Sequence, residues 1–129
     1  MTVFLDTDLL IDCLRGTSAA RVWLEQSETE TFQVPGVVAM ELLMGCQNKI
    51  ELERTTRFLH AFDIAWPEAS EFAQAYELLA ARRLNSGLGI PDCLIVAMAL
   101  ARSARLYTFN LKHFQTIEGL DVHAPYTRP

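Results

Sequence analysis

Short apolar runs alternate with longer segments of helical periodicity along this 129-residue chain. The apolar runs predict strands, whose ranges are Val3–Leu5, Thr31–Val34, Asp63–Trp66, Arg105–Phe109 and Leu120–His123. Between them, apolar side chains recur at helical spacing, and this spacing predicts helices. Two helices are expected to be capped by Thr7 and Ser18, and the others to span Pro35–Asn48, Lys49–Phe62, Pro67 to the stop signal Asn85–Gly87, and Asp92–Ser103.

This alternation predicts a single α/β domain over residues 1–129, with a short, mainly parallel central sheet and helices on both faces. In such sheets, ligands bind beyond the carboxyl ends of the strands, where the strand order reverses. Asp6 and Asn110 each follow a predicted strand directly. We therefore expect both side chains at that edge of the sheet.

The composition is ordinary for a globular domain, since 50% of the residues are apolar and 21% are charged, and it excludes disordered and collagen-like chains. The N-terminal segment has no basic leader, and Asp6 and Asp8 interrupt its apolar run. We therefore expect neither a signal peptide nor a membrane span, and a location in the cytoplasm. The net charge of −5 argues against binding nucleic acid through a broad basic surface, but a metal ion in an acidic cleft would reverse the local charge.

Three acidic side chains are candidates for a site, because one closes the first strand and the two most apolar helices each carry one acid. Asp6 directly follows the first strand, so its carboxylate should lie at the rim of the sheet. Glu41 is the only charged residue between positions 31 and 48, and its helix has no polar stripe, so we expect it to be buried. Such a carboxylate needs an arginine or a metal ion to compensate its charge. Asp92 lies in the first turn of a helix that is apolar all round and therefore expected to be central.

Helix-start chemistry is the alternative explanation for several of these acids, because a helix dipole stabilises negative charge in the first turn. For Asp12, helix-start chemistry is a better explanation than a functional role, and for Asp8 the two explanations are equally good. For Asp92 taken alone, helix-start chemistry is sufficient. Three carboxylates in one cleft, however, repel each other unless a hard cation neutralises them, and Mg²⁺ or Mn²⁺ takes such oxygen ligands. If Asp6, Glu41 and Asp92 meet, their grouping predicts a metal site.

Four segments together resemble the motifs of PIN-domain proteins, specifically VapC-type toxins of bacterial or archaeal toxin–antitoxin pairs. They are FLDTDLLIDCLRG, VPGVVAMELLMG, GIPDCLIVAMAL and LYTFNLKHF, in the family's order, within Val3–Phe114. The resemblance implies a PIN-like fold and an endoribonuclease that needs Mg²⁺ or Mn²⁺, with Asp6, Glu41 and Asp92 as metal ligands. It also implies products with a 5′-phosphate and a 3′-hydroxyl, a homodimer, and a VapB-like antitoxin protein that lays a helical or extended segment over the enzyme.

One position departs from the family pattern. Many relatives carry a fourth acid after the penultimate strand, where this chain has Asn110, followed three residues later by His113. Asn110 remains a candidate catalytic residue, because its carbonyl oxygen is a possible ligand, but it brings no charge. We therefore expect one firmly bound metal ion rather than two. Thr7 and Thr108 are candidates for orienting waters or carboxylates, although a threonine in a strand is ordinary.

Some residues are candidates for contacts with partners. Arg15, Arg82, Arg83 and Lys112 are candidates for holding the RNA backbone, although a solvated surface position explains each of them as well. Leu10, Leu14 and Trp23 are candidates for an antitoxin groove, and core packing explains them equally well.

Two other functions stay open from the sequence. The segment FLDTDLL also resembles the nucleophile motif of haloacid-dehalogenase-like phosphatases, with Asp6 as nucleophile and Asp8 as acid, but the chain is short for that class. The second alternative is a catalytically weak PIN-like module that only binds a partner, which Asn110 and the acidic composition suggest.

Overall fold

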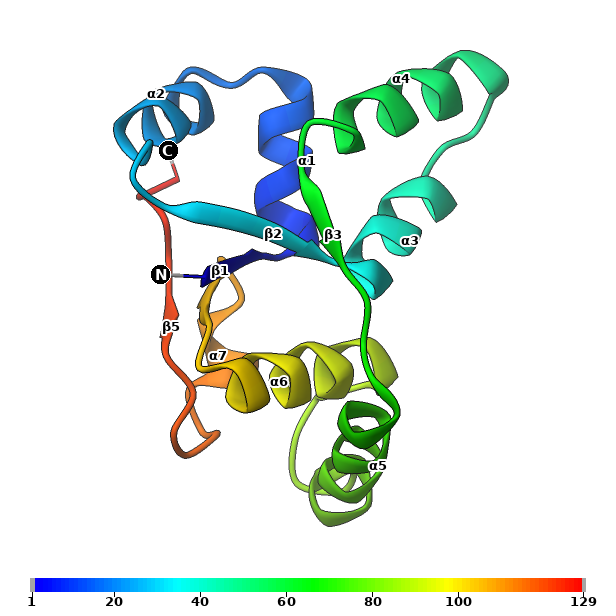
Figure 1. Cartoon of the computed structure of the whole chain (residues 1–129), viewed down its shortest axis with the longest axis vertical. Helices are drawn as coiled ribbons and strands as arrows, with labels where there is room; N and C mark the ends of the chain where they lie inside the picture. The colour runs from blue at the N-terminus through cyan, green and yellow to red at the C-terminus, as the bar shows by residue number, and fades with distance from the viewer. Residues whose placement is uncertain (1, 129) are drawn as a thin grey trace.

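The structure is a computed structural model that describes residues 2–128 (Figure 1). Its elements follow one another in the order β1 (Thr2–Leu5), α1 (Thr7–Arg15), α2 (Ser18–Gln26), β2 (Thr31–Pro35), α3 (Gly36–Met44), α4 (Lys49–Leu59), β3 (Asp63–Ala65), α5 (Ala69–Arg82), α6 (Ile90–Arg102), β4 (Arg105–Tyr107), α7 (Leu111–Phe114) and β5 (Val122–His123). The predicted mixture of helices and short strands is confirmed.

The strands form one five-stranded sheet in the order β3-β2-β1-β4-β5, and every pairing between neighbours is parallel. The chain moves from the central strand β1 out to β3 and then crosses to β4 on the other side of β1. The strand order therefore reverses between β1 and β4. The carboxyl ends of these two strands flank the place where open α/β sheets bind ligands.

Helices cover both faces of the sheet, as the sequence predicts. In Figure 1, α1, α2 and α4 lie above the strands, α3 lies beside the end of β2, and α5 and α6 lie below the strands. All residues of α6 from Cys93 through Ala99 are buried, which confirms that this helix is central. In β1, Val3, Phe4 and Leu5 have no exposed surface, so the central strand is enclosed on both faces.

In the first two helices, the capping residue lies one position before the residue that the sequence suggests. Asp6 caps α1 by accepting a hydrogen bond from the N–H of Thr7, and Thr17 caps α2 by accepting one from the N–H of Ala20. The predictions of Thr7 and Ser18 as caps are therefore wrong by one residue. Each time, two neighbouring residues carry an oxygen that is able to cap, so residue type alone does not separate them.

Other boundaries differ for local reasons. Pro35 ends β2 instead of beginning a helix, and α5 begins at Ala69 instead of Pro67. Asn48 does not continue α3, because its side chain caps α4. Helix α7 is absent from the prediction because four residues carry too little periodicity to indicate a helix.

Helix α3 turns a different face to the solvent than the sequence suggests. It packs on the core through Val38, Ala39 and Leu42, whereas Met44 is 85% exposed. Glu41 is exposed on the same open face, so the expectation that it would be buried is wrong. The helix is apolar overall, and its sequence therefore did not show which face would pack.

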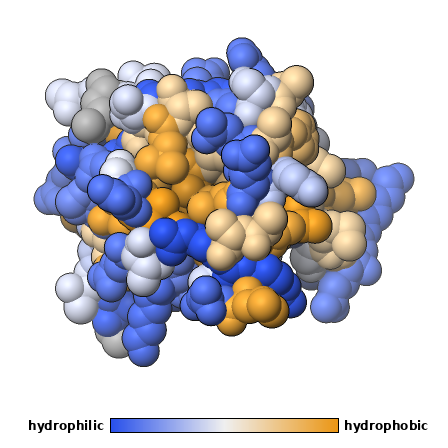
Figure 2. All heavy atoms as spheres, turned by 90° about the horizontal axis from the view of Figure 1, so that it is seen from below, coloured by the Kyte–Doolittle hydropathy of each residue, from blue (hydrophilic) through white to orange (hydrophobic). Residues whose placement is uncertain are grey.

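An apolar surface lies beneath the sheet. Figure 2 shows apolar side chains gathered on this face. Phe72 and Tyr76 of α5 and Ile90 of α6 are exposed and line one hollow between these two helices. Among residues 2–128, no helix is both long enough and apolar enough to cross a membrane.

Candidate active site

Asp6 stands where the central strand ends and the first helix begins. Its N–H donates to the carbonyl oxygen of Tyr107, at the end of β4, over 3.0 Å. Its carboxylate accepts two hydrogen bonds of 2.8 Å, one at Oδ1 from the N–H of Thr7 and one at Oδ2 from the hydroxyl of Thr108. Strand end, helix cap and neighbouring strand together fix the direction of this carboxylate, and Asp6 lies at the sheet edge as predicted.

Thr108 is fully buried and connects several groups around Asp6. Its hydroxyl also lies 3.3 Å from Oδ2 of Asp8, and that oxygen accepts the N–H of Phe109 over 3.0 Å. The hydroxyl oxygen in turn accepts the N–H of Asn110 over 3.0 Å. Asp8 therefore holds the segment after β4 in place, a role the sequence left open. The sequence makes Thr108 only a weak candidate for orienting a carboxylate, because nothing in the sequence indicates that it contacts Asp6.

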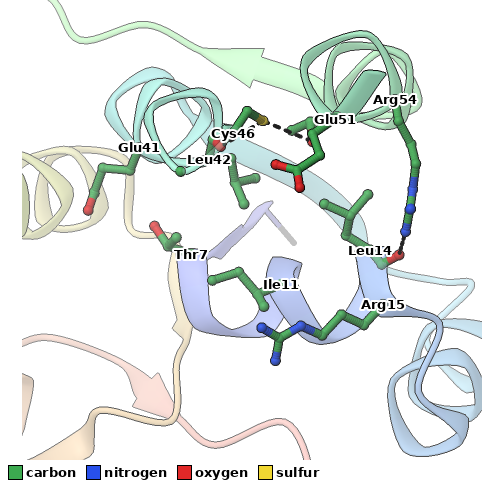
Figure 3. A pocket seen from close by; sticks show the side chains of 11 residues that line it. Thr7, Ile11, Leu14, Arg15, Glu41, Leu42, Cys46, Glu51 and Arg54 are labelled. Carbon is green, nitrogen blue, oxygen red and sulfur yellow. Dashed lines mark hydrogen bonds between the residues drawn. The ribbon is translucent and has the colours of Figure 1, made fainter. Parts of the chain in front are cut away.

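Glu41 reaches the same region from α3. Its carboxylate is exposed at one end of the pocket drawn in Figure 3, with the Thr7 side chain close below it. Although Glu41 is exposed, neighbouring atoms displace part of the water around its carboxylate, and this desolvation is the largest cause that raises its pKa. The negative charges of Asp6 and Asp92 raise the pKa further. These charges interact with Glu41 only because the three acids lie near one another.

Asp92 comes from the first turn of α6, on the other side of the sheet. Its Oδ2 accepts the N–H of Gly89 over 3.2 Å, as a helix-start acid does. Its charge nevertheless acts on the pKa of both Asp6 and Glu41. The structure thus brings Asp6, Glu41 and Asp92 into one region, called here the acidic cluster.

The pKa of Asp6 is raised to about 6. Burial is the largest cause, and the charge of Asp8 comes next, while the hydrogen bonds from Thr108 and Thr7 lower the pKa. The charge of Asp92 adds a smaller increase. A carboxyl group with such a pKa lacks a positive partner, and perturbed groups of this kind are common at functional sites.

The acidic cluster has no counter-ion among the residues that the structure describes. Within residues 2–128, none of the salt bridges involves Asp6, Glu41 or Asp92. The alternative in which an arginine compensates Glu41 is therefore not what the structure contains. A bound cation remains as the source of compensating charge.

The side chains of the cluster suit a hard cation that keeps part of its water shell better than one that is held by protein ligands alone. In the part of the chain that the structure describes, no three His, Cys, Asp or Glu side chains converge closely enough to form a ready-made metal site. Mg²⁺ usually keeps several waters and takes only one or two carboxylates directly. The buried hydroxyl of Thr7 also has no hydrogen-bond partner within residues 2–128, and a water of such a cation would supply one. Donor chemistry and the unpaired hydroxyl both fit Mg²⁺ or Mn²⁺.

Asn110 lies at the edge of the cluster with an exposed side chain. Its amide nitrogen Nδ2 is 2.7 Å from Nδ1 of His113. The backbone of Asn110 is tied to Thr108, so the residue is next to the site, but its side chain is engaged with the histidine ring.

A pocket of about 290 Å³ extends from the cluster between α1, α3 and α4. Figure 3 shows Thr7 and Glu41 at one end, with Glu51 and Arg54 farther along its wall. Arg54 donates to the carbonyl oxygen of Leu14, which closes part of the far side. The floor is apolar and the walls carry charge of both signs.

Of the three residues suggested for a groove, only one lines this pocket. Leu14 does so, whereas Leu10 is fully buried in the core. Trp23 packs its ring against Phe32 and Tyr107, with ring centroids 5.3 and 4.9 Å away. Leu10 therefore belongs to the core, and Trp23 is half-buried against two neighbouring rings, so neither of them lines this pocket.

The C-terminal segment adds contacts that the sequence did not indicate. Arg128 donates to both carboxylate oxygens of Asp12 over 3.2 Å and lies 3.9 Å above the ring of Phe109. The hydroxyl of Tyr126 donates to Asp12 over 2.8 Å. Asp12 thus anchors the C-terminal segment. It does not lie in the first turn of α1, where Asp8 is the acid, so the helix-start explanation is wrong for Asp12.

Comparison with known families gives a match over most of the chain. Residues 3–120 match the PIN domain family. The four sequence motifs that carry the acidic cluster and Asn110 all lie inside this range. The match thus covers both the sheet and the candidate site.

Individual relatives agree with this match. Ribonuclease VapC19 of Mycobacterium tuberculosis is 34% identical over 127 residues, covering 95% of this chain and 98% of the relative. Ribonuclease VapC10 of the same organism is 30% identical over 124 residues, covering 92% and 90%. Among solved structures, a toxin–antitoxin complex from Klebsiella pneumoniae has a chain with a TM-score of 0.75 and 26% identity, covering 96% of this chain and 98% of that one.

Proposed function

The chain belongs to the PIN domain family, and we propose that it is a metal-dependent endoribonuclease toxin whose activity a cognate antitoxin protein blocks. The ribonuclease relatives extend over nearly its whole length. The single observation that carries the proposal is the acidic cluster, because Asp6, Glu41 and Asp92 share one region without a counter-ion among residues 2–128. The substrate is RNA, and the site of action is the cytoplasm.

Asp6, Glu41 and Asp92 would hold the cation, Mg²⁺ or Mn²⁺. When bound, the cation supplies Lewis-acid chemistry at the scissile phosphate and at the attacking water. The remaining contribution of the protein is orientation. Thr108 and Thr7 fix the Asp6 carboxylate through hydrogen bonds at its two oxygens, and Asp8 keeps the Thr108 segment in place.

Asn110 limits the charge of the site. A fourth acid at this position would add a negative charge beside the cluster, whereas the amide of Asn110 adds none. Its side chain is also engaged with His113. The site therefore holds one cation firmly and a second one weakly at most, and Asn110 contributes to catalysis without acting as a charged ligand.

The antitoxin is a VapB-like protein whose segment occupies the pocket between α1, α3 and α4. The apolar floor at Ile11, Leu14 and Leu42 suits the apolar face of a helix or an extended peptide. Glu41 at one end of the pocket suits a basic side chain of that segment. Such a side chain would compete with the cation for the same carboxylates and so block the enzyme.

The protein forms a homodimer. The exposed apolar residues Phe72, Tyr76 and Ile90 of α5 and α6 line one hollow and support this assembly, because monomers rarely leave such a group of side chains in water. Light scattering on the eluting peak of a gel-filtration column measures the mass. A monomeric mass at micromolar concentration would contradict the homodimer.

The test of the proposed activity uses the purified chain, freed of any co-purified partner by unfolding and refolding. It is incubated with structured RNA and, separately, with a phosphate monoester, each in Mn²⁺ or in EDTA. Cleavage of RNA in Mn²⁺ that stops in EDTA and in Asp6→Asn is the expected result. Products are expected to carry a 5′-phosphate and a 3′-hydroxyl.

The same assay separates the alternatives. Hydrolysis of the monoester through a trapped phospho-aspartate would identify a phosphatase instead. Inactivity on a broad set of RNAs, with the chain folded and loaded with Mn²⁺, would favour a module that only binds a partner.

A further inference from the structure

A short segment after β5 packs on the ring of Phe109, next to the candidate active site. This segment, residues 124–128, is called here the strap, and it lies beyond residues 3–120, the range that matches the PIN domain family. Arg128 lies 3.9 Å from the centre of the Phe109 ring, and the ring of Tyr126 meets it edge-on with centroids 5.1 Å apart. A cation–π contact and an aromatic contact from one segment thus hold the same ring.

The strap is also bonded to α1, at two residues that are one helical turn apart. Arg128 donates to both carboxylate oxygens of Asp12 and to the carbonyl oxygen of Asp8, each over 3.2 Å. The hydroxyl of Tyr126 donates to the Asp12 carboxylate over 2.8 Å. The Asp12 side chain is only 15% exposed, so these bonds are partly shielded from water. The strap therefore ties Phe109 to the first helix.

The joint between Phe109 and α1 lies directly beside Asp6. The N–H of Phe109 donates to Oδ2 of Asp8 over 3.0 Å, and the hydroxyl of Thr108 donates to Oδ2 of Asp6 over 2.8 Å. Because Thr108 and Phe109 are consecutive, a shift of this backbone away from α1 would also draw the hydroxyl away from Asp6. The strap contacts both sides of the joint, since Arg128 is bonded to Asp8 and packs on Phe109.

We propose that Arg128 and Tyr126 are positioning residues of the candidate active site, which hold Phe109 against α1 and so keep the Thr108 hydroxyl on the Asp6 carboxylate. The proposal rests on the proposed ribonuclease function, because it assigns residues that orient the metal ligand of that function. None of the hydrogen bonds that these two side chains form within residues 2–128 reaches the acidic cluster. Their effect on the cluster therefore passes through other residues.

Binding of Mn²⁺ tests the proposal without requiring RNA cleavage. Arg128→Ala should weaken Mn²⁺ binding about three- to tenfold in isothermal titration calorimetry, because the ion pair and the cation–π contact that hold Phe109 are lost. Arg128→Lys keeps the charge but does not bind both oxygens of Asp12 in the same way, so it should recover only part of the loss. The matched control is Arg105→Ala, which removes an arginine that pairs with Asp121 at the start of β4, away from the cluster, and should bind Mn²⁺ as the wild type does. Equal Mn²⁺ affinity in Arg128→Ala and Arg105→Ala would overturn the proposal.

A double-mutant cycle tests whether the strap acts through Thr108. Since Thr108→Val removes the hydroxyl, adding Arg128→Ala to it should weaken Mn²⁺ binding little further. The same four proteins, unfolded by urea in EDTA, give a readout that needs no metal. The equilibrium constant for unfolding of the double variant should differ at least about threefold from the product of the two single effects, because the residues belong to one network.

This cycle separates failure of the proposal from failure of the proposed function. If the wild type binds no Mn²⁺, the proposed function fails, and the urea cycle alone decides on the strap. Single effects that multiply independently in urea would overturn the proposal, whether or not the protein proves to be a ribonuclease.

Cleavage kinetics separate positioning from direct contact with RNA. In Arg128→Ala, the Mn²⁺ concentration for half-maximal rate should rise about three- to tenfold, whereas KM for RNA at saturating Mn²⁺ should change by less than about twofold. Tyr126→Phe keeps the ring on Phe109 and loses only the bond to Asp12, so its effect should be smaller than that of Tyr126→Ala. Thermal melting of each variant shows whether it is folded at the assay temperature. A raised KM with unchanged Mn²⁺ affinity would overturn the proposal, since Arg128 would then contact the RNA itself.

Discussion

The hydroxyl of Thr108 lies 2.8 Å from Oδ2 of Asp6, although 102 positions separate the two residues in the sequence. The contact joins the end of β4 to the end of the central strand β1, where the strand order of the sheet reverses. Since Thr108 is completely buried, the hydrogen bond is shielded from water. The carboxylate that is proposed to hold the metal ion is therefore oriented by a neighbour that touches no substrate.

Thr108→Val removes the hydroxyl and keeps the shape of the side chain. Cleavage activity should fall by about ten- to a hundredfold, as is usual when a partner that orients a metal ligand is lost. The free energy of unfolding should fall by about 1–3 kcal/mol, because the N–H of Asn110 loses its acceptor. Initial cleavage rates and urea unfolding measure the two effects.

Two further variants control this prediction. Thr108→Ser retains the hydroxyl and should restore most of the activity. Thr56→Val removes an exposed hydroxyl from α4 that bonds only to its own helix, and should leave activity unchanged. Equal activity in Thr108→Val and Thr56→Val would show that the contact with Asp6 does not matter.

The raised pKa of Asp6 predicts a cost to stability in the absence of metal. The pKa is about 6 in the folded protein against 3.8 for an unperturbed group, so the folded state binds more protons between these values. The contribution of Asp6 to the free energy of unfolding is thus largest below pH 3.8, and it is lost as the pH rises through about 6. Asp6→Asn has no such titration and should be more stable than the wild type by about 1–2 kcal/mol at pH 7.5.

Urea unfolding in EDTA at several pH values measures this difference. The advantage of Asp6→Asn should vanish near pH 4 and be complete above about pH 7. Asp63→Asn, at an exposed position in β3, should show no such pattern. A wild type that is as stable as Asp6→Asn at neutral pH would contradict the unfavourable burial of this charge.

The fold was largely predictable from the sequence, because strands that are buried on both faces read as short apolar runs. Val3–Leu5 predicted β1, and the apolar segment Asp92–Ser103 predicted a central helix. The remaining errors are local. A helix of four residues has no detectable period, and adjacent residues with capping oxygens shift a helix start by one position.

The candidate site was predictable only in part. The sequence identifies Asp6 because it directly follows a buried strand, and the order of residues along the chain is enough to show this. Glu41 was expected to be buried, but in an apolar helix the sequence does not show which side faces the core. The contacts of Thr108 with Asp6 and of Gly87 with His113 join segments that are far apart in the chain. Neither the periodicity nor the motifs of the sequence indicate such long-range contacts, so only the structure reveals them.

An ion pair below the sheet, between the buried Glu71 and the partly exposed Arg102, should contribute to stability independently of the site. Glu71 is 4% exposed and accepts hydrogen bonds of 2.8 and 2.7 Å from Arg102, which lowers the pKa of its carboxyl group. Arg102→Met leaves this charge unpaired and should lower the free energy of unfolding by roughly 2–4 kcal/mol at pH 7. The lowered pKa of Glu71 stabilises the folded protein only above the pKa that Glu71 has in the unfolded chain. The difference in free energy of unfolding between the wild type and Arg102→Met should therefore shrink as the pH falls.

Urea unfolding at pH 7 and pH 4 measures this effect. Arg57→Met, which removes an exposed arginine from α4, is the matched control and should change stability by less than about 0.5 kcal/mol. Equal stability of the two variants at pH 7 would contradict the assignment. The metal dependence of RNA cleavage should be the same in Arg102→Met as in the wild type, since the pair does not contact the acidic cluster.

Asn110→Asp should restore the negative charge that the family pattern places at this position. We expect the wild type to bind a single Mn²⁺ ion firmly, and the variant to bind a second one or to bind the first one more tightly. Isothermal titration calorimetry gives both the number of ions and the affinity. If the two proteins have the same affinity and the same number of ions, the missing acid has no effect on metal binding.

The most direct test of the account is the rate of RNA cleavage as a function of Mn²⁺ concentration. We predict a rate that rises and saturates for the wild type and for the exposed control Asp63→Asn, and that falls to background in EDTA. Asp6→Asn, Glu41→Gln and Asp92→Asn should each lose at least about a hundredfold at every Mn²⁺ concentration, because each removes a charge from the acidic cluster. Cleavage that persists in EDTA, or full activity in Asp6→Asn, would contradict the assignment of these three carboxylates to a catalytic metal ion.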